Sequence, residues 1–249
     1  MTAAKLERSL ALAGLSAPVH WHEVTGSTNS DAAELAEQDA PEWTLVGAGH
    51  QTAGRGRLGR TWLDRPGAAL MTSIVLRPSM PVETLGLLTL LAGAAWAESA
   101  RDVAAADVRC KWPNDLMIGE DKVGGVLAES SVVGDTVRWV VIGSGVNLSA
   151  PDVAGAVGLG APVDTVTVLA GFLTRFHDAY TRPTDEMADE TIARWSAVSA
   201  TLGRAVAATG IDGIRHEGLA VAIDATGRLT VETPRGRVSV ASDEVEHLR

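Results

Sequence analysis

The sequence predicts an α+β protein in which a mixed, mostly antiparallel sheet is flanked by helices and followed by a small β-barrel. Between residues 108 and 146, strand-like segments follow one another across turns of mostly two or three residues, too short for the crossovers that parallel neighbours need. Helical patterns precede and follow these segments. After residue 199 the chain changes to short strands separated by glycine-containing turns, which is typical of a small barrel. We therefore expect two domains, 1–199 and 200–249.

The first half of the larger domain alternates helices and strands. Apolar spacing and helix formers predict, in chain order, a helix at 5–12, a strand at 20–24, a helix at 32–37, strands at 44–50 and 69–76, and a helix at 82–100. The helix at 32–37 follows a cluster of capping residues. One of Ser27, Thr28, Asn29 and Ser30 is expected to be its N-cap, because their side chains accept hydrogen bonds from free backbone N–H groups.

The second half of the chain is richer in strands. The predicted elements are strands at 108–112, 115–118, 122–130 and 139–146, helices at 166–179 and 185–198, and barrel strands at 204–208, 213–223, 229–233 and 236–241. Turn signals separate the barrel strands, for example at residues 224–227.

The composition limits the kinds of protein this chain can be. Its 21 Lys and Arg against 31 Asp and Glu give a net charge of −10, which disfavours a nucleic-acid-binding body. The single cysteine, Cys110, excludes an internal disulfide and a multi-cysteine metal site. The most apolar stretch, 85–97, is too short to span a bilayer, and residues 1–15 do not look like a signal peptide. We expect a cytoplasmic protein with no membrane partner and no metal held by protein ligands alone.

Residues 49–62 carry the densest chemical signal. Arg55, Arg57 and Arg60 alternate with three glycines, and no acid falls among them. Glycine lets the backbone approach a ligand closely, and the planar fork of arginine suits phosphate and carboxylate. We interpret this segment as a mobile loop that closes around a small anion. The alternatives are a solvated hairpin tip or a loop that binds nucleic acid. Loops that bind nucleic acid normally have interleaved aromatic residues, and only Trp62 is present.

Three further motifs are compatible with a binding site. The hydroxyl and amide groups of residues 27–29 stand at a predicted helix N-terminus, where they can bind an uncharged urea or amide, or serve as a cap alone. Lys111 and Lys122 flank one predicted hairpin and can converge on one cleft, or can lie at the surface. Residues 142–147 run from apolar residues into two glycines and an asparagine, which indicates either a strand end facing a ligand or a β-bulge.

Taken in order, Ser27-Thr-Asn29, Gln51-Thr-Ala-Gly-Arg-Gly-Arg57, Lys111-Trp-Pro-Asn-Asp115 with Lys122, and Gly145-Val-Asn147 resemble biotin protein ligases. The resemblance covers residues 20–150 in motif detail and implies a class II synthetase-like catalytic domain with a C-terminal SH3-like domain. It implies two steps: biotin and ATP, with Mg²⁺, give biotinyl-5′-AMP, and a lysine of a biotin carboxyl carrier domain then receives the biotin.

The resemblance also assigns residues to substrates. On the biotin side it places Ser27, Thr28, Asn29, Gln51, Gly54, Arg55, Gly56, Arg57, Lys122 and Gly125. On the ATP side it places Arg57, Arg60, Trp62, Lys111, Asn114 and Asn147. The expected catalytic cations are Lys122, Arg57 and Lys111. Because a carboxylate and ATP repel each other, a site joining them needs several cations, and this motif set supplies them.

Other functions compete with this hypothesis. A lipoate–protein ligase shares the catalytic fold, a non-catalytic module could use the loop to hold nucleic acid, and a degenerate biotin sensor would bind without turnover. Some relatives also carry an N-terminal helix-turn-helix domain that represses transcription. The first motif here starts at Ser27, so we expect no repressor activity and no nucleic-acid partner beyond ATP. The family contains monomers and homodimers, and we expect a monomer or a weak homodimer.

Overall fold

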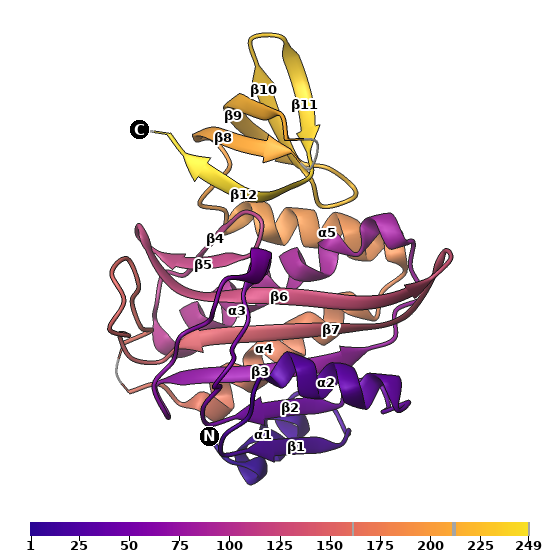
Figure 1. Cartoon of the computed structure of the whole chain (residues 1–249), viewed down its shortest axis with the longest axis vertical. Helices are drawn as coiled ribbons and strands as arrows, with labels where there is room; N and C mark the ends of the chain where they lie inside the picture. Colours follow the sequence, from indigo (N-terminus) through magenta and orange to yellow (C-terminus); the bar gives the residue numbers. More distant parts are fainter. Residues whose placement is uncertain (161, 211–212, 249) are drawn as a thin grey trace.

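Two sheets organise the part of the chain that the structure describes, residues 1–160, 162–210 and 213–248. In this computed structural model the larger sheet has seven strands in the order β1-β2-β3-β7-β6-β5-β4 (Figure 1). Only β1 and β2 are parallel, and the other neighbouring pairs are antiparallel. The bounds are β1 Val19–His22, β2 Leu45–Ala48, β3 Ala69–Leu76, β4 Arg109–Lys111, β5 Asp115–Ile118, β6 Asp121–Val133 and β7 Thr136–Asn147. The predicted mixed, mostly antiparallel sheet is confirmed.

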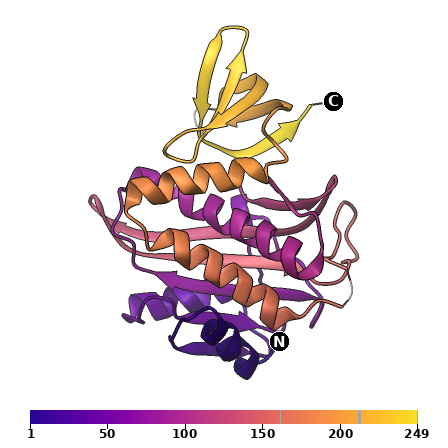
Figure 2. The same ribbon diagram turned by 180° about the vertical axis from the view of Figure 1, so that it is seen from behind.

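Helices cover the two faces of this sheet unequally. Helices α3 (Gly86–Ala104), α4 (Thr165–Tyr180) and α5 (Thr184–Ala197) form a layer across one face, as Figure 2 shows, and α1 (Ala3–Leu12) packs against α4. Helix α2 (Thr28–Glu37) packs on the other face against β2, β3 and β7. That second face is otherwise open, and the segment joining β2 to β3 crosses it (Figure 1).

The core lies between the sheet and the α3–α4–α5 layer. All eight residues of β3 are buried, since helices cover it on both sides. Helix α3 buries thirteen of its nineteen residues, and its Trp96 stacks on Phe172 of α4 with ring centroids 4.4 Å apart. No helix in the described ranges is both long enough and apolar enough to cross a membrane.

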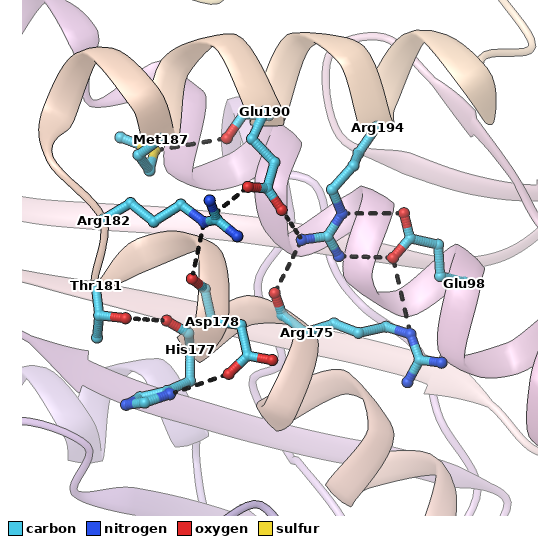
Figure 3. Close-up of polar contacts among 10 residues, drawn as sticks. Glu98, Arg175, His177, Asp178, Thr181, Arg182, Met187, Glu190 and Arg194 are labelled. Atoms are coloured by element: carbon cyan, nitrogen blue, oxygen red, sulfur yellow. Dashed lines mark hydrogen bonds and ion pairs between the residues drawn. The ribbon is translucent and has the colours of Figure 1, made fainter.

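An ion-pair network joins the three helices of the layer (Figure 3). Arg194 of α5 holds the Glu98 carboxylate of α3 through two hydrogen bonds of 3.0 and 2.6 Å. The same guanidinium donates to the Arg175 carbonyl of α4 at 2.9 Å. Arg182 and Glu190 add a further pair at 2.8 Å between the α4–α5 connection and α5. These contacts fix the spacing of helices that share a predominantly apolar interface.

The smaller sheet has five antiparallel strands in the order β11-β10-β9-β8-β12 and lies beyond α5 and β4 (Figure 1). Its strands are β8 Ala205–Gly210, β9 Arg215–Ile223, β10 Leu229–Thr233, β11 Gly236–Val240 and β12 Ser242–His247. The sequence predicted the first four of these with small shifts and missed β12. The proposed division of the chain at residue 200 falls between α5 and β8.

The remaining predicted elements agree with the structure except at their ends. The predicted helix 82–100 begins too early, because a 3₁₀ turn, Val82–Thr84, comes first and the α-helix runs from Gly86 to Ala104. Strand 44–50 is wrong at its end, because β2 stops at Ala48 where the chain turns away toward the loop. Strand 69–76 and strand 115–118 have the predicted bounds.

Candidate active site

A cavity on the open face of the larger sheet gathers most of the predicted site residues. It lies between the N-terminus of α2, the loop at 54–62 and the strands β5, β6 and β7. The predicted residues that line it are Ser27, Thr28, Asn29, Gln51, Arg55, Gly56, Arg57, Arg60, Trp62, Lys111, Asn114, Lys122 and Gly125. Residues that are distant in the sequence therefore form one site.

The N-terminus of α2 brings uncharged polar groups to the cavity. Ser27 is the N-cap, although its side chain makes no capping bond. Instead, the Thr28 backbone N–H donates to Gln51 Oε1 at 2.7 Å, and the Thr28 hydroxyl also donates to that oxygen at 3.1 Å. The Ser73 hydroxyl of β3 contacts both the Thr28 hydroxyl at 2.8 Å and Asn29 Oδ1 at 2.6 Å. This network holds the helix terminus against the sheet.

Asn29 is also tied to β6. Its Nδ2 donates to the Leu127 carbonyl at 3.2 Å and to Glu129 Oε2 at 2.8 Å. A Cβ on Gly143 of β7 would stand 1.7 Å from Asn29 Oδ1, so only glycine leaves room for this amide. Gly145 likewise makes room for the Trp62 indole, since a Cβ there would lie 2.8 Å from the ring. Both glycines belong to a regular part of β7, so the sequence feature at 142–147 is a strand facing the cavity, not a bulge.

The arginine and glycine loop folds into a short hairpin over the cavity. Gly56 N–H donates to the Arg60 carbonyl at 2.7 Å, and Trp62 N–H donates to the Gly54 carbonyl at 2.9 Å. A 3₁₀ turn, Arg57–Gly59, forms the tip, with Leu58 at a φ of 57°. Arg55 pairs with Glu129 at 2.8 Å. The Trp62 indole N–H is buried and has no hydrogen-bond partner among the described residues, so it can donate to a ligand.

Strands β4 and β6, on either side of β5, bring Lys111 and Lys122 to the same cavity. Lys122 pairs with Asp115, and Lys111 stands at the other side of the turn. Asn114 secures this turn, because its Nδ2 donates to the Val126 carbonyl at 2.9 Å and its own carbonyl accepts from Val126 N–H at 3.0 Å. The interpretation that the lysines converge on one cleft therefore agrees with the structure.

The smaller sheet supports the turn between β4 and β5. The Trp112 indole donates to the Gly227 carbonyl at 3.0 Å, and the Trp112 backbone N–H donates to the Thr201 hydroxyl at 3.0 Å. The Trp112–Pro113 peptide is cis. Val245 of β12 also lines the cavity. Both sheets thus contribute to the walls of the site.

Two predicted site residues lie outside the cavity lining. Gly54 packs against Trp62, whose carbonyl oxygen would be 2.8 Å from a Cβ at that position. Asn147 is 5 % exposed, and its Nδ2 donates to the Val157 carbonyl at 3.2 Å. The contact of both residues with a substrate stays a prediction.

The sequence did not reveal Ser73 or Glu129. Ser73 occurs inside a buried strand, where a single serine has no distinctive pattern, and Glu129 occurs in a strand with other polar residues. Only the pairing of β3, β6 and β7 beside α2 brings these side chains to the site.

The arrangement suits a ligand with an uncharged polar head and an anionic tail. Hydroxyl and amide groups at the N-terminus of α2 line the cavity together with the cations Arg55, Arg57, Lys111 and Lys122. Asp115 is the one carboxylate lining the cavity within the described residues. Such an excess of cations stabilises phosphate or carboxylate groups and the charge that develops between them.

Comparison with known proteins agrees with this chemistry. Residues 21–147 match the Biotin/lipoate A/B protein ligase family, and residues 201–248 match the Biotin protein ligase C terminal domain. The Bacillus subtilis bifunctional ligase/repressor BirA is 33 % identical over 237 residues, which cover 91 % of this chain and 73 % of the relative. The Mycobacterium tuberculosis biotin–[acetyl-CoA-carboxylase] ligase is 32 % identical over 259 residues, 98 % of this chain and 96 % of the relative.

The fold is also similar to a solved structure. The biotin protein ligase from Aquifex aeolicus in complex with biotin and ATP has a TM-score of 0.75, with 24 % sequence identity. The match covers 93 % of this chain and 99 % of that one. The expected ligase-type fold is therefore confirmed for both sheets.

Proposed function

This chain belongs to the biotin/lipoate A/B protein ligase family, and we propose that within it the chain acts as a biotin protein ligase. It activates biotin with ATP to biotinyl-5′-AMP and transfers the biotin to a lysine of a biotin carboxyl carrier domain. The observation that carries this proposal is one cavity lined both by uncharged hydroxyl and amide groups and by several cations. Biotin has the matching form, since it joins a neutral ureido head to a carboxylate.

We assign the uncharged groups at the N-terminus of α2 to the ureido head. Thr28, Asn29 and Gln51 offer hydroxyl and amide groups there, with Ser27 at the helix N-terminus. Gln51 Oε1 already accepts from Thr28, so its amide nitrogen is left to donate to a ligand. A site built to hydrogen-bond a polar group discriminates strongly against ligands that lack it. Lipoate has no ureido group, which is why we favour biotin over lipoate.

The cations that line the cavity support the first reaction step. A carboxylate oxygen of biotin attacks the α-phosphorus of ATP, the bond to the β-phosphate oxygen breaks, and pyrophosphate leaves. Negative charge is brought together in this step, and Arg55, Arg57, Lys111 and Lys122 stabilise it. We place Arg57, Arg60, Trp62, Lys111, Asn114 and Asn147 on the ATP side, with Gly54, Gly56 and Gly125 allowing close backbone approach on the biotin side.

In the second step the neutral amine of the acceptor lysine attacks the acyl carbon of the mixed anhydride. The amide bond forms as the bond to the phosphate oxygen breaks, AMP leaves, and the amine releases a proton. A mixed anhydride is readily hydrolysed, so the cavity must exclude water until the lysine arrives. The loop at 54–62 lies over the cavity and is suited to that role.

Mg²⁺ fits this site as part of the ATP substrate. Within the described residues no group of three or more His, Cys, Asp or Glu side chains could hold a metal, and Asp115 is paired with Lys122. Mg²⁺ commonly keeps several waters and binds substrate phosphates with few protein ligands. We therefore propose that it enters with ATP, neutralising part of the phosphate charge, and that the phosphates carry most of its coordination.

The test is substrate-dependent pyrophosphate release by the purified protein, followed by labelling of a biotin carboxyl carrier domain. Release is expected with biotin and ATP together, and not with either alone. Lipoate in place of biotin is the matched control and is expected to give much weaker release. Release with lipoate but not biotin would instead identify a lipoate–protein ligase, and binding of biotin without any release would indicate a sensor.

A further inference from the structure

Glu129 of β6 contacts two parts of the site, the N-terminus of α2 and the loop at 54–62. Its Oε2 accepts a hydrogen bond of 2.8 Å from Asn29 Nδ2 at the N-terminus of α2. The same oxygen accepts one of 2.8 Å from Arg55 Nη2 in the loop. Asn29 precedes Glu129 by 100 positions and Arg55 precedes it by 74. Glu129 does not itself line the cavity, so it affects a bound substrate through these two residues.

The contact with Asn29 fixes the orientation of an amide. Asn29 is 4 % exposed, and its Oδ1 accepts from Ser73 while its Nδ2 donates to Glu129 and to the Leu127 carbonyl. Both amide hydrogens are thereby used, and a carboxylate acceptor opposes the flipped amide, which would turn an oxygen toward it. One lone pair of Oδ1 stays available for a donor in the cavity.

The contact with Arg55 holds the loop in place over the sheet. The side chain of Glu129 is 31 % exposed and that of Arg55 is 43 % exposed, so solvent weakens the pair but does not remove it. The bond occupies one of the five guanidinium N–H donors and leaves the others for a ligand anion. An arginine already anchored by one hydrogen bond loses less side-chain entropy when it binds that anion.

We propose that Glu129 is a positioning residue for biotin activation, which orients the Asn29 amide and anchors Arg55 with the loop over the cavity. This inference rests on the proposed function. It assigns two separable effects to one carboxylate: binding of the biotin head through Asn29, and the rate of adenylate formation through Arg55.

Two substitutions separate these effects. Glu129→Gln keeps an oxygen that can accept from Asn29 but loses the charge that attracts Arg55, so we expect kcat to fall about fivefold to tenfold, with KM for biotin changed less than about threefold. Glu129→Ala removes both contacts, and KM for biotin is expected to rise about tenfold in addition. The matched control is Glu232→Gln, which breaks an exposed glutamate–arginine pair in the smaller sheet and is expected to change neither parameter.

The same substitution made in an Arg55→Gln protein tests whether Glu129 acts through Arg55. In an Arg55→Gln protein, Glu129→Gln is expected to cause no further loss of kcat, because the contact is already absent. Hydrogen exchange without substrates gives an independent readout: amides at 54–62 are expected to exchange faster in Glu129→Gln than in the unsubstituted protein, while β3 is unchanged.

The outcomes distinguish this inference from the proposed function. If the unsubstituted protein releases no pyrophosphate, the proposed function fails, and exchange at 54–62 still decides whether Glu129 anchors the loop. If that protein is active, Glu129→Gln with normal kcat and normal exchange overturns the inference. An equal loss of kcat in both Arg55 backgrounds also overturns it. If Glu129→Ala does not fold, Glu129→Gln decides the outcome, since it keeps the size and an acceptor oxygen.

Discussion

The space beside Gly143 is the tightest constraint on a single residue of the site. Gly143→Ala would place a Cβ 1.7 Å from Asn29 Oδ1, so the amide must move away from Ser73 and Glu129. We expect biotin to bind at least about tenfold more weakly, the scale of one or two lost hydrogen bonds to an uncharged ligand. Titration calorimetry measures this directly.

The control lies next to the same helix terminus. A Cβ on Gly26 meets no atom within 4 Å, so Gly26→Ala is expected to bind biotin normally. Equal affinity of Gly143→Ala and the unsubstituted protein would show that the Asn29 amide does not contact biotin.

Lys122 and Arg57 are the cations for which we predict the largest effect on catalysis. Lys122→Ala and Arg57→Ala are each expected to lower the rate of biotinyl-5′-AMP formation at least about tenfold, because each removes a charge-assisted contact to the reacting groups. The measurement is single-turnover formation of the adenylate. Unchanged rates in both variants would remove these residues from the catalytic step.

At this scale the sequence revealed residues that stand in a local motif better than isolated ones. Arginines alternating with glycines are rare enough to predict an anion site, and all three line one cavity. Ser73 and Glu129 could not be found, because their importance comes from strand pairing and not from their neighbours in the chain. Only its motif indicates Asn147, and in the structure its amide donates to the Val157 carbonyl.

Among the elements, the loop at 54–62 is expected to respond most to substrates. Most of its side chains are exposed or half-buried, and only a few backbone hydrogen bonds close its hairpin. We predict that biotin with ATP slows amide exchange in this loop strongly, since the ligand supplies anions for its arginines. Exchange mass spectrometry measures this, and β9 serves as the internal control. Protection that is the same with and without substrates would contradict the role of the loop in excluding water.

In the helix layer, stability is expected to depend most on the Arg194 guanidinium. It is only 17 % exposed and holds Glu98 while bonding the Arg175 carbonyl (Figure 3). Arg194→Ala leaves a partly buried carboxylate without its main partner, so we expect a loss of about 2 kcal/mol in the free energy of unfolding. The exposed Arg237→Ala is the control, with an expected loss below about 0.5 kcal/mol. Urea unfolding measures both, and equal losses would contradict the argument.

The elements were predictable in type but less so at their ends. A mostly apolar run identified β3, and turn residues on both sides of β5 gave its bounds. Helix α3 begins four residues later than expected, because residues 82–84 form a 3₁₀ turn after Pro81. The sequence does not predict β12, because this strand pairs with β8 and no short hairpin turn joins the two.

At the scale of the whole molecule, His247 makes stability depend on pH. Burial, together with the charges of Lys111 and Arg204, lowers the pKa of His247 from 6.5 to about 4. Between pH 4 and pH 6.5, His247 is therefore mostly protonated in the unfolded chain and mostly neutral in the folded chain. The contribution of His247 to the free energy of unfolding is fully present above pH 6.5 and is lost as the pH falls toward 4.

The expected loss is about 1 kcal/mol by pH 5, after allowance for the exposure of this side chain to solvent. His247→Gln cannot gain the proton and is expected to lose about 1 kcal/mol less between pH 7 and pH 5. Urea unfolding at both values compares the two proteins. A parallel decline in both would assign the acid sensitivity to other groups.

The hydrogen bond from the Trp112 indole to the Gly227 carbonyl connects the last fifty residues to the turn that follows Lys111. Chimaeras that exchange this segment between relatives will work only when the incoming turn presents a backbone oxygen at the same point. Without that oxygen, the Trp112 indole N–H has no acceptor beside Lys111. We expect such a chimaera to lose turnover before it loses the ability to fold.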